Sequence, residues 1–79
     1  MKVNLEALSP GEAFVVKWQY GGLGTFERAL ADCIAKADTN NLKRLVAGFP
    51  EEVRGIVLYT GTPGWWDKVK VKAGIKEAS

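Results

Sequence analysis

Apolar positions recur at helical spacing in short stretches along the chain, separated by polar or glycine-containing breaks. The clearest stretch runs from residue 26 to residue 37 and predicts a helix with one apolar stripe. The stripe consists of Phe26, Ala29, Leu30, Cys33, Ile34 and Ala37. We expect Thr25 to cap this helix and the stripe to form the spine of the core. Asp32 and Lys36 lie four residues apart on the other side, which is a favourable spacing for an ion pair.

Ser9-Pro10-Gly11-Glu12 indicates an earlier helix start, with a hydroxyl N-cap, a proline at the first helical position and a glutamate three residues after the cap. The stretch that follows is ambiguous. Apolar residues alternate from Phe14 to Tyr20 as in a strand, whereas Phe14 and Trp18 also share a helix face. The capping signal favours a helix that ends at the glycines of residues 21–24, and a short strand at 14–20 stays the alternative.

Three further elements follow a polar turn at residues 38–41. The spacing of Leu42, Leu45, Val46 and Phe49 predicts a third helix. A fourth begins at Pro50 and buries Val53, Ile56 and Val57, although Gly55 weakens it. Thr62-Pro63 starts a last element, in which residues 68–72 alternate between lysine and valine and allow either a helix or a short strand. The sequence therefore predicts an all-α, compact single domain of four to five short helices over residues 1–79, with residues 73–79 frayed.

Composition narrows the chemistry that such a domain can perform. The 79 residues include one cysteine and no histidine, so neither an intrachain disulfide nor a zinc site is expected. Without histidine there is no imidazole to activate a nucleophile, and we expect no catalytic residues, no metal and no cofactor. Cys33 is expected to be a buried core residue because it belongs to the apolar stripe. Small domains without such supports often self-associate, so a homo-oligomer is plausible.

No signal peptide or membrane-spanning stretch is recognisable, and a cytoplasmic location is therefore expected. The net charge of +2 is distributed unevenly. Residues 1–40 hold four basic and five acidic side chains, whereas residues 41–79 hold seven basic and four acidic ones. The excess of positive charge thus lies in the C-terminal half, where it favours contact with an acidic or phosphate-bearing partner.

Two motifs could bind nucleotides or nucleic acid. Gly22-Leu23-Gly24 precedes a helix, but the third glycine of a dinucleotide fingerprint is replaced by Glu27, so a plain turn is the better interpretation. The second and third helices resemble a helix-turn-helix pair. In that alternative, bases or phosphates would be contacted by Asn40, Asn41, Lys43 and Arg44. The turn lacks glycine and carries Asp38, which favours a solvated helix face instead.

The segment from Leu58 to Lys68 has the strongest features of a binding surface. Successive helical residues differ by about 100°, so Trp65 and Trp66 cannot face the same way, and if one of them is in the core we expect the other to be partly exposed. An exposed tryptophan beside lysines suits a protein partner. The candidate partner-binding residues are Tyr59, Trp65, Trp66, Lys68, Lys70 and Lys72. Stacking on bases with the lysines on phosphates, or simple packing of both rings at the edge of the core, are the alternatives.

Residues 18–66 resemble a group of short, uncharacterised proteins encoded by phages and prophages. The resemblance is carried by the following segments: Trp18-Gln19-Tyr20, Phe26, Ala35-Lys36-Ala37-Asp38, Asn41-Leu42, Gly48-Phe49-Pro50-Glu51-Glu52-Val53 and Pro63-Gly64-Trp65-Trp66. It implies an accessory protein of a virus or mobile element that inhibits host machinery, as anti-CRISPR proteins do. These segments are helix boundaries and turns, and they transfer no functional residue.

The leading hypothesis is a non-catalytic protein that inhibits a host complex by occupying a protein surface. A small nucleic-acid-binding protein is the second hypothesis, using Asn40 to Arg44 or the lysine-rich C-terminal segment. A self-associating assembly protein is the third.

Overall fold

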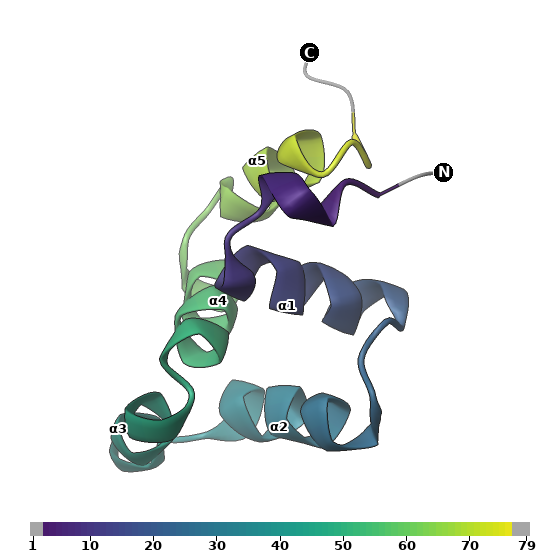
Figure 1. Ribbon diagram of the computed structural model, residues 1–79. Coiled ribbons are helices and arrows are strands. Elements are labelled where there is room, and N and C mark those ends of the chain that lie inside the picture. Colours follow the sequence, from purple (N-terminus) through teal and green to yellow (C-terminus); the bar gives the residue numbers. More distant parts are fainter. Residues whose placement is uncertain (1–2, 77–79) are drawn as a thin grey trace.

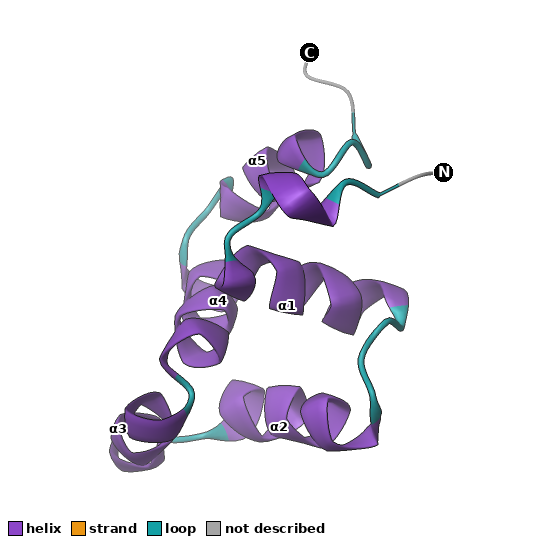
Figure 2. Cartoon of the chain, in the orientation of Figure 1, coloured by secondary structure: helices purple, strands orange, loops and turns teal. Residues whose placement is uncertain are grey.

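The computed structural model describes residues 3–76, and this part of the chain contains helices and no strand (Figure 2). The elements are a short 3-10 helix at Leu5–Ala7 and the five α-helices α1 (Pro10–Tyr20), α2 (Thr25–Lys36), α3 (Thr39–Gly48), α4 (Pro50–Gly61) and α5 (Trp65–Lys72). The predicted all-α fold is confirmed. Both stretches that could have been strands, 14–20 and 68–72, are helical.

Helix α4 is the centre of the fold because it packs against α1, α2, α3 and α5, and most extensively against α1. Figure 1 shows α1 and α2 side by side, with α4 running past their ends and α5 on the far side of α1 from α2. The main core cluster lies between these helices and comprises Phe14, Val15, Leu23, Leu30, Ala31, Ile34, Val53 and Ile56. The charged and polar residues of the described chain lie outside this core.

Close contact between α1 and α4 depends on two glycines. A β-carbon added to Gly11 would lie 2.6 Å from the carbonyl oxygen of Glu51. One added to Gly55 would meet the carbonyl oxygen of Gly11 and lie 2.9 Å from its carbonyl carbon. All of these neighbours are backbone atoms, which cannot rotate away as a side chain can. Gly55, a weakness in the helical pattern of the sequence, is therefore what allows α4 to approach α1.

Two of the predicted helix starts are confirmed, and two are wrong. Ser9 and Glu12 form both hydrogen bonds of a capping box, and Pro50 is the first residue of α4. Thr25, however, is already inside α2, whose N-cap is Gly24. Thr62 follows the end of α4, and α5 begins three residues later, after Gly64 with φ 82°. Glycine tolerates this left-handed conformation, so the chain can turn sharply between α4 and α5.

The buried face of α2 also differs from the predicted stripe. Leu30, Ala31 and Ile34 are buried, whereas Phe26 is 66% exposed and Cys33 is exposed. The prediction of Cys33 as a core residue is therefore wrong. Relative to the predicted stripe, the buried face of α2 is rotated so that it includes Ala31. The neighbouring Asp32 accepts a hydrogen bond from Trp18 Nε1 of α1 at 3.3 Å instead of pairing with Lys36. Spacing alone could not distinguish these two orientations of the helix.

The two ends of the described chain lie side by side (Figure 1). The backbone N–H of Asn4 donates a hydrogen bond to the carbonyl oxygen of Ala73, and Ala73 is fully buried. Gly74, with φ 76°, then reverses the chain, so that the N–H of Ile75 reaches the carbonyl of Lys70. Fraying therefore does not begin at residue 73 as predicted. Residues 77–79 lie outside the described residues.

Candidate protein-binding surface

Five aromatic side chains from three helices meet at one corner of the molecule. This aromatic cluster consists of Trp18 and Tyr20 at the end of α1, Tyr59 near the end of α4, and Trp65 and Trp66 at the start of α5. The ring centroids of Tyr59 and Trp66 are 5.4 Å apart in an edge-to-face arrangement, and those of Trp18 and Tyr59 are 5.8 Å apart in a similar one. Tyr20 and Trp65 both lie near-parallel to Trp66, at 6.4 and 6.5 Å. Trp66 is thus the central ring.

Exposure separates one member of the cluster from the others. Tyr20 is 56% exposed, whereas Trp18, Tyr59, Trp65 and Trp66 are half-buried and pack against the core. Of the alternatives that the sequence left open for Trp65 and Trp66, the structure has both rings packed at the edge of the core. Both tryptophans contribute to the attachment of α5, and only Tyr20 presents most of its ring to solvent.

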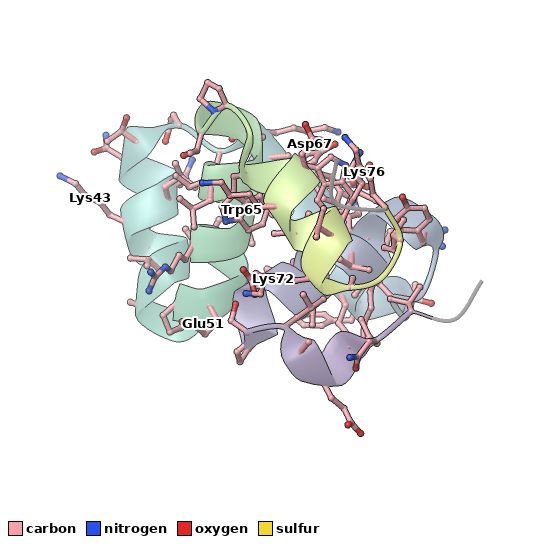
Figure 3. All side chains as sticks on the ribbon, turned by 90° about the horizontal axis from the view of Figure 1, so that it is seen from above. Lys43, Glu51, Trp65, Asp67, Lys72 and Lys76 are labelled. Carbon is pink, nitrogen blue, oxygen red and sulfur yellow. The ribbon has the colours of Figure 1, made fainter. Side chains whose placement is uncertain are left out.

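The two tryptophans nevertheless line different hollows, as their positions on successive residues of α5 require. Trp65 lines a hollow of about 250 Å³ between α1 and α4, together with Arg54 and Lys72. Trp66 lines another of about 280 Å³ with Tyr59 and the turn at residues 60–64. Figure 3 shows Trp65 between α5 and α4.

The lysines of α5 have different surroundings. Lys72 Nζ lies 2.7 Å from Glu12 Oε1 and joins α5 to α1. Lys70 Nζ lies 5.8 Å from the centre of the Trp66 ring and 3.3 Å from Asp67 Oδ1. Lys68 is exposed on the same helix, and no carboxylate among residues 3–76 pairs with it. Of the three lysines predicted to bind a partner, Lys68 alone is both exposed and without a carboxylate partner within the described chain.

These ion pairs affect two carboxyl groups. Burial raises the pKa of Glu12, but hydrogen bonds from Lys72 and Ser9 outweigh this effect and leave the pKa below its ordinary value. Hydrogen bonds from Lys76 and Lys70 likewise lower the pKa of the exposed Asp67. Figure 3 shows Asp67 beside Lys76, with Lys72 separated from both in the direction of Glu51. Both carboxylates are therefore ionised at neutral pH and neutralise part of the lysine charge.

The residues of the nucleic-acid alternative lie on another part of the molecule, at the start and first turns of α3. Asn40, Asn41, Lys43 and Arg44 are all exposed, and Lys43 extends away from the body of the molecule (Figure 3). Asp38 Oδ1 accepts a hydrogen bond from the backbone N–H of Asn41 at 2.8 Å and so caps α3. The connection between α2 and α3 is only two residues long. The structure does not bring these side chains together with the aromatic cluster.

The glycine turn before α2 has an acidic side chain at its helix start. A β-carbon on Gly24, the N-cap of α2, would lie 3.1 Å from the Glu27 carboxylate. A negative charge therefore stands close to the position in which a helix N-terminus would hold an anion. This placement favours the interpretation of residues 22–24 as a plain turn.

Some features of the surface had no sequence signal. Trp18 and Tyr20 were part of an ambiguous stretch, and nothing in the local pattern connected them with Trp66, more than forty residues later.

Among residues 3–76 no group of three or more histidine, cysteine, aspartate or glutamate side chains is placed to hold a metal ion. Within the same range, no helix has the length and apolar character needed to cross a membrane. Comparisons of the chain with protein-family models, curated proteins and solved structures found no match.

Proposed function

We propose that this chain is a non-catalytic binding protein that acts by occupying the surface of a protein partner. The observation that carries the proposal is the exposure of Tyr20. Its side chain is 56% exposed and lies near-parallel to the Trp66 ring, at the edge of the cluster of five aromatic side chains. Tyrosine and tryptophan are the side chains most enriched among the residues that dominate binding energy. We therefore place the contact at Tyr20, with Tyr59 and Trp66 beside it.

The cluster is suited to binding because its rings are already ordered. Trp66 fixes Tyr20 by a near-parallel contact, and Tyr59 and Trp18 continue the packing towards the core. A partner would therefore lose little affinity to the ordering of side chains on this protein. Lys68, which is exposed on the same helix as Trp66, adds a positive charge that speeds encounter with an acidic partner.

Protein is a better partner for this surface than single-stranded nucleic acid. Base stacking requires an aromatic ring with a free face. The Trp66 ring has Tyr20 and Trp65 near-parallel to it and the Lys70 ammonium group over it. Glu12 and Asp67 also pair with Lys72 and Lys70, which leaves fewer cations for phosphates. The resemblance of residues 18–66 to phage and prophage proteins supports a host complex, such as a defence complex, as the partner.

The test is comparative affinity capture from a nuclease-treated bacterial lysate, quantified by mass spectrometry. We expect a protein held by the wild type to be lost when Tyr20→Ala and Lys68→Glu are combined, because truncating one large aromatic side chain in the middle of an interface costs about tenfold or more in affinity. Phe26→Ala with Lys43→Glu is the matched control, since it removes a ring that is even more exposed than Tyr20 and makes the same charge change on α2 and α3. Equal recovery with both double variants would refute this placement of the contact.

A further inference from the structure

A second surface of different chemistry lies at the junction of α2 and α3, away from α5 (Figure 1). It is a hollow of about 410 Å³, large enough for a side chain or small ligand. Its lining comes from the last turn of α2, the connection and the first two turns of α3: Cys33, Lys36, Ala37, Asn41, Arg44 and Leu45. None of these residues belongs to the aromatic cluster.

The lining combines apolar groups with flanking cations. The apolar part of the lining comes from Cys33, Ala37 and Leu45. Cys33 is exposed to solvent, although a free cysteine usually behaves as a small apolar residue. Helix α3 has no fully buried residue, so the apolar side of this helix is incompletely covered by the rest of the described chain. An uncovered apolar surface of this kind is typical of a contact site.

Charge defines what can fill the hollow. Lys36 and Arg44 line it from α2 and α3, and neither forms an ion pair with a carboxylate among residues 3–76. The nearby Asp38 uses its Oδ1 to cap α3 through the N–H of Asn41. Lys43, the residue directly before Arg44 on α3, is a further exposed cation outside the lining. The hollow therefore presents two unpaired cations beside an apolar lining.

We propose that this hollow docks an acidic segment of a protein, with one large apolar side chain placed between Cys33 and Leu45 and carboxylates paired with Lys36 and Arg44. Arginine can bind a carboxylate through two parallel hydrogen bonds, which gives such a contact direction as well as charge. A nucleic acid fits less well, because the lining offers no aromatic ring for stacking and a phosphate gains nothing from apolar groups. The proposal is independent of the aromatic cluster and of its partner.

The probe is a fluorescein-labelled helical peptide of about twelve residues that is rich in glutamate and carries a single leucine, which supplies the one large apolar side chain. One matched peptide carries glutamine in place of glutamate, and a second carries serine in place of leucine. A thymidine oligonucleotide of equal charge is the nucleic-acid probe. Binding is measured by fluorescence anisotropy and located by the shifts of backbone amide resonances in the full chain.

We expect the acidic leucine peptide alone to bind, with amide shifts concentrated at Ala37, Asn41 and Leu45. Lys36→Glu and Arg44→Glu should each weaken binding about three- to tenfold, whereas Lys68→Glu, an identical charge change on α5, should leave it unchanged. Cys33 is the only cysteine, so its reaction with a thiol reagent should slow when the peptide is bound.

Four outcomes would overturn the proposal. Equal binding of the glutamine peptide would remove the role of charge, and equal binding of the serine peptide would remove that of the apolar lining. Preferential binding of the oligonucleotide would assign the surface to nucleic acid. Loss of binding with Lys68→Glu, together with shifts on α5, would transfer the acidic segment to the aromatic cluster. Failure of the capture experiment above leaves all of these readouts intact, because they use a defined peptide and test the hollow through Lys36 and Arg44, which the capture experiment does not change.

Discussion

Replacing Gly55 by alanine introduces one methyl group at the place where α4 crosses α1. The new β-carbon would meet the carbonyl oxygen of Gly11 and lie 2.9 Å from its carbonyl carbon and 3.1 Å from its α-carbon. Since these are backbone atoms of a helix, the only relief is a separation of α1 from α4. That separation loosens the most extensive helix contact of the described chain, which includes the buried Val15 and Ile56.

Two opposing effects determine the size of the change. Alanine favours a helix interior over glycine by about 1 kcal/mol. Overpacking of a well-packed contact costs about 1–3 kcal/mol, and the upper end applies here because no side chain can yield. We therefore expect Gly55→Ala to lower the free energy of unfolding by about 2 kcal/mol. A chain of this size has roughly 4–12 kcal/mol in total, and the loss corresponds to a Tm lower by about 10 °C.

The assay is thermal and urea unfolding followed by circular dichroism, with Gly61→Ala as the control. Gly61 is the last residue of the same helix, and an added β-carbon there has no atom within 4 Å. The control should be unchanged or more stable by up to about 1 kcal/mol. If Gly55→Ala were as stable as Gly61→Ala, the close crossing of α1 and α4 would be refuted.

Three further predictions concern individual side chains. Glu12→Gln should lower the free energy of unfolding at pH 7 by about 1 kcal/mol, because it weakens the capping box and removes the partner of Lys72. The pKa of Glu12 is lowered in the folded state, so the ionised carboxylate stabilises the fold above about pH 4.5, and this stabilisation is lost as the pH falls through the folded-state pKa. The free energies of unfolding of wild type and variant, measured with urea, should therefore converge in acid. A difference that stays constant with pH would contradict the ion pair. Trp66→Ala should lower the free energy of unfolding by about 2 kcal/mol and Tyr20→Ala by less than about 1 kcal/mol, because Trp66 is half-buried against the core whereas Tyr20 is 56% exposed. If thermal unfolding showed equal losses of stability for the two variants, Tyr20 would also have a structural role. Cys33 should react with a thiol reagent in the native protein nearly as fast as in urea, and strong native-state protection would place it back in the core.

Local signals in the sequence were sufficient for most of the helices. The capping box at Ser9 and the proline at residue 50 act within one turn, and their hydrogen bonds and backbone angles are set by neighbours in the chain. The all-α fold followed from these signals and from the 3-4 spacing of apolar residues. Thr25 and Thr62 failed as caps because α2 begins one residue earlier than expected, after Gly24, and α5 begins only after Gly64, whose left-handed backbone turns the chain.

Orientation and long-range contact could not be predicted in the same way. A stripe containing Phe26, Leu30 and Cys33 fits two rotations of α2, and the choice depends on what α1 and α4 place against it. The approach of Gly55 to Gly11 depends on the crossing of two helices forty-four residues apart in the sequence. Of the candidate site, Tyr59, Trp66 and Lys68 could be named in advance because aromatic and basic residues were adjacent. Tyr20 could not, because its contact with Trp66 exists only once α5 has packed against α1.

The most direct test of the proposed function is photo-crosslinking at the aromatic cluster. Tyr20→p-benzoylphenylalanine places a photoreactive group on the most exposed ring of the cluster, and Phe26→p-benzoylphenylalanine places the same group on an exposed ring of α2. After irradiation in bacterial cells, we predict a discrete, protease-sensitive and nuclease-resistant crosslinked species from position 20 that is absent from position 26. Crosslinks to nucleic acid, the same species from both positions, or no species from position 20 would contradict a protein-binding role for this surface.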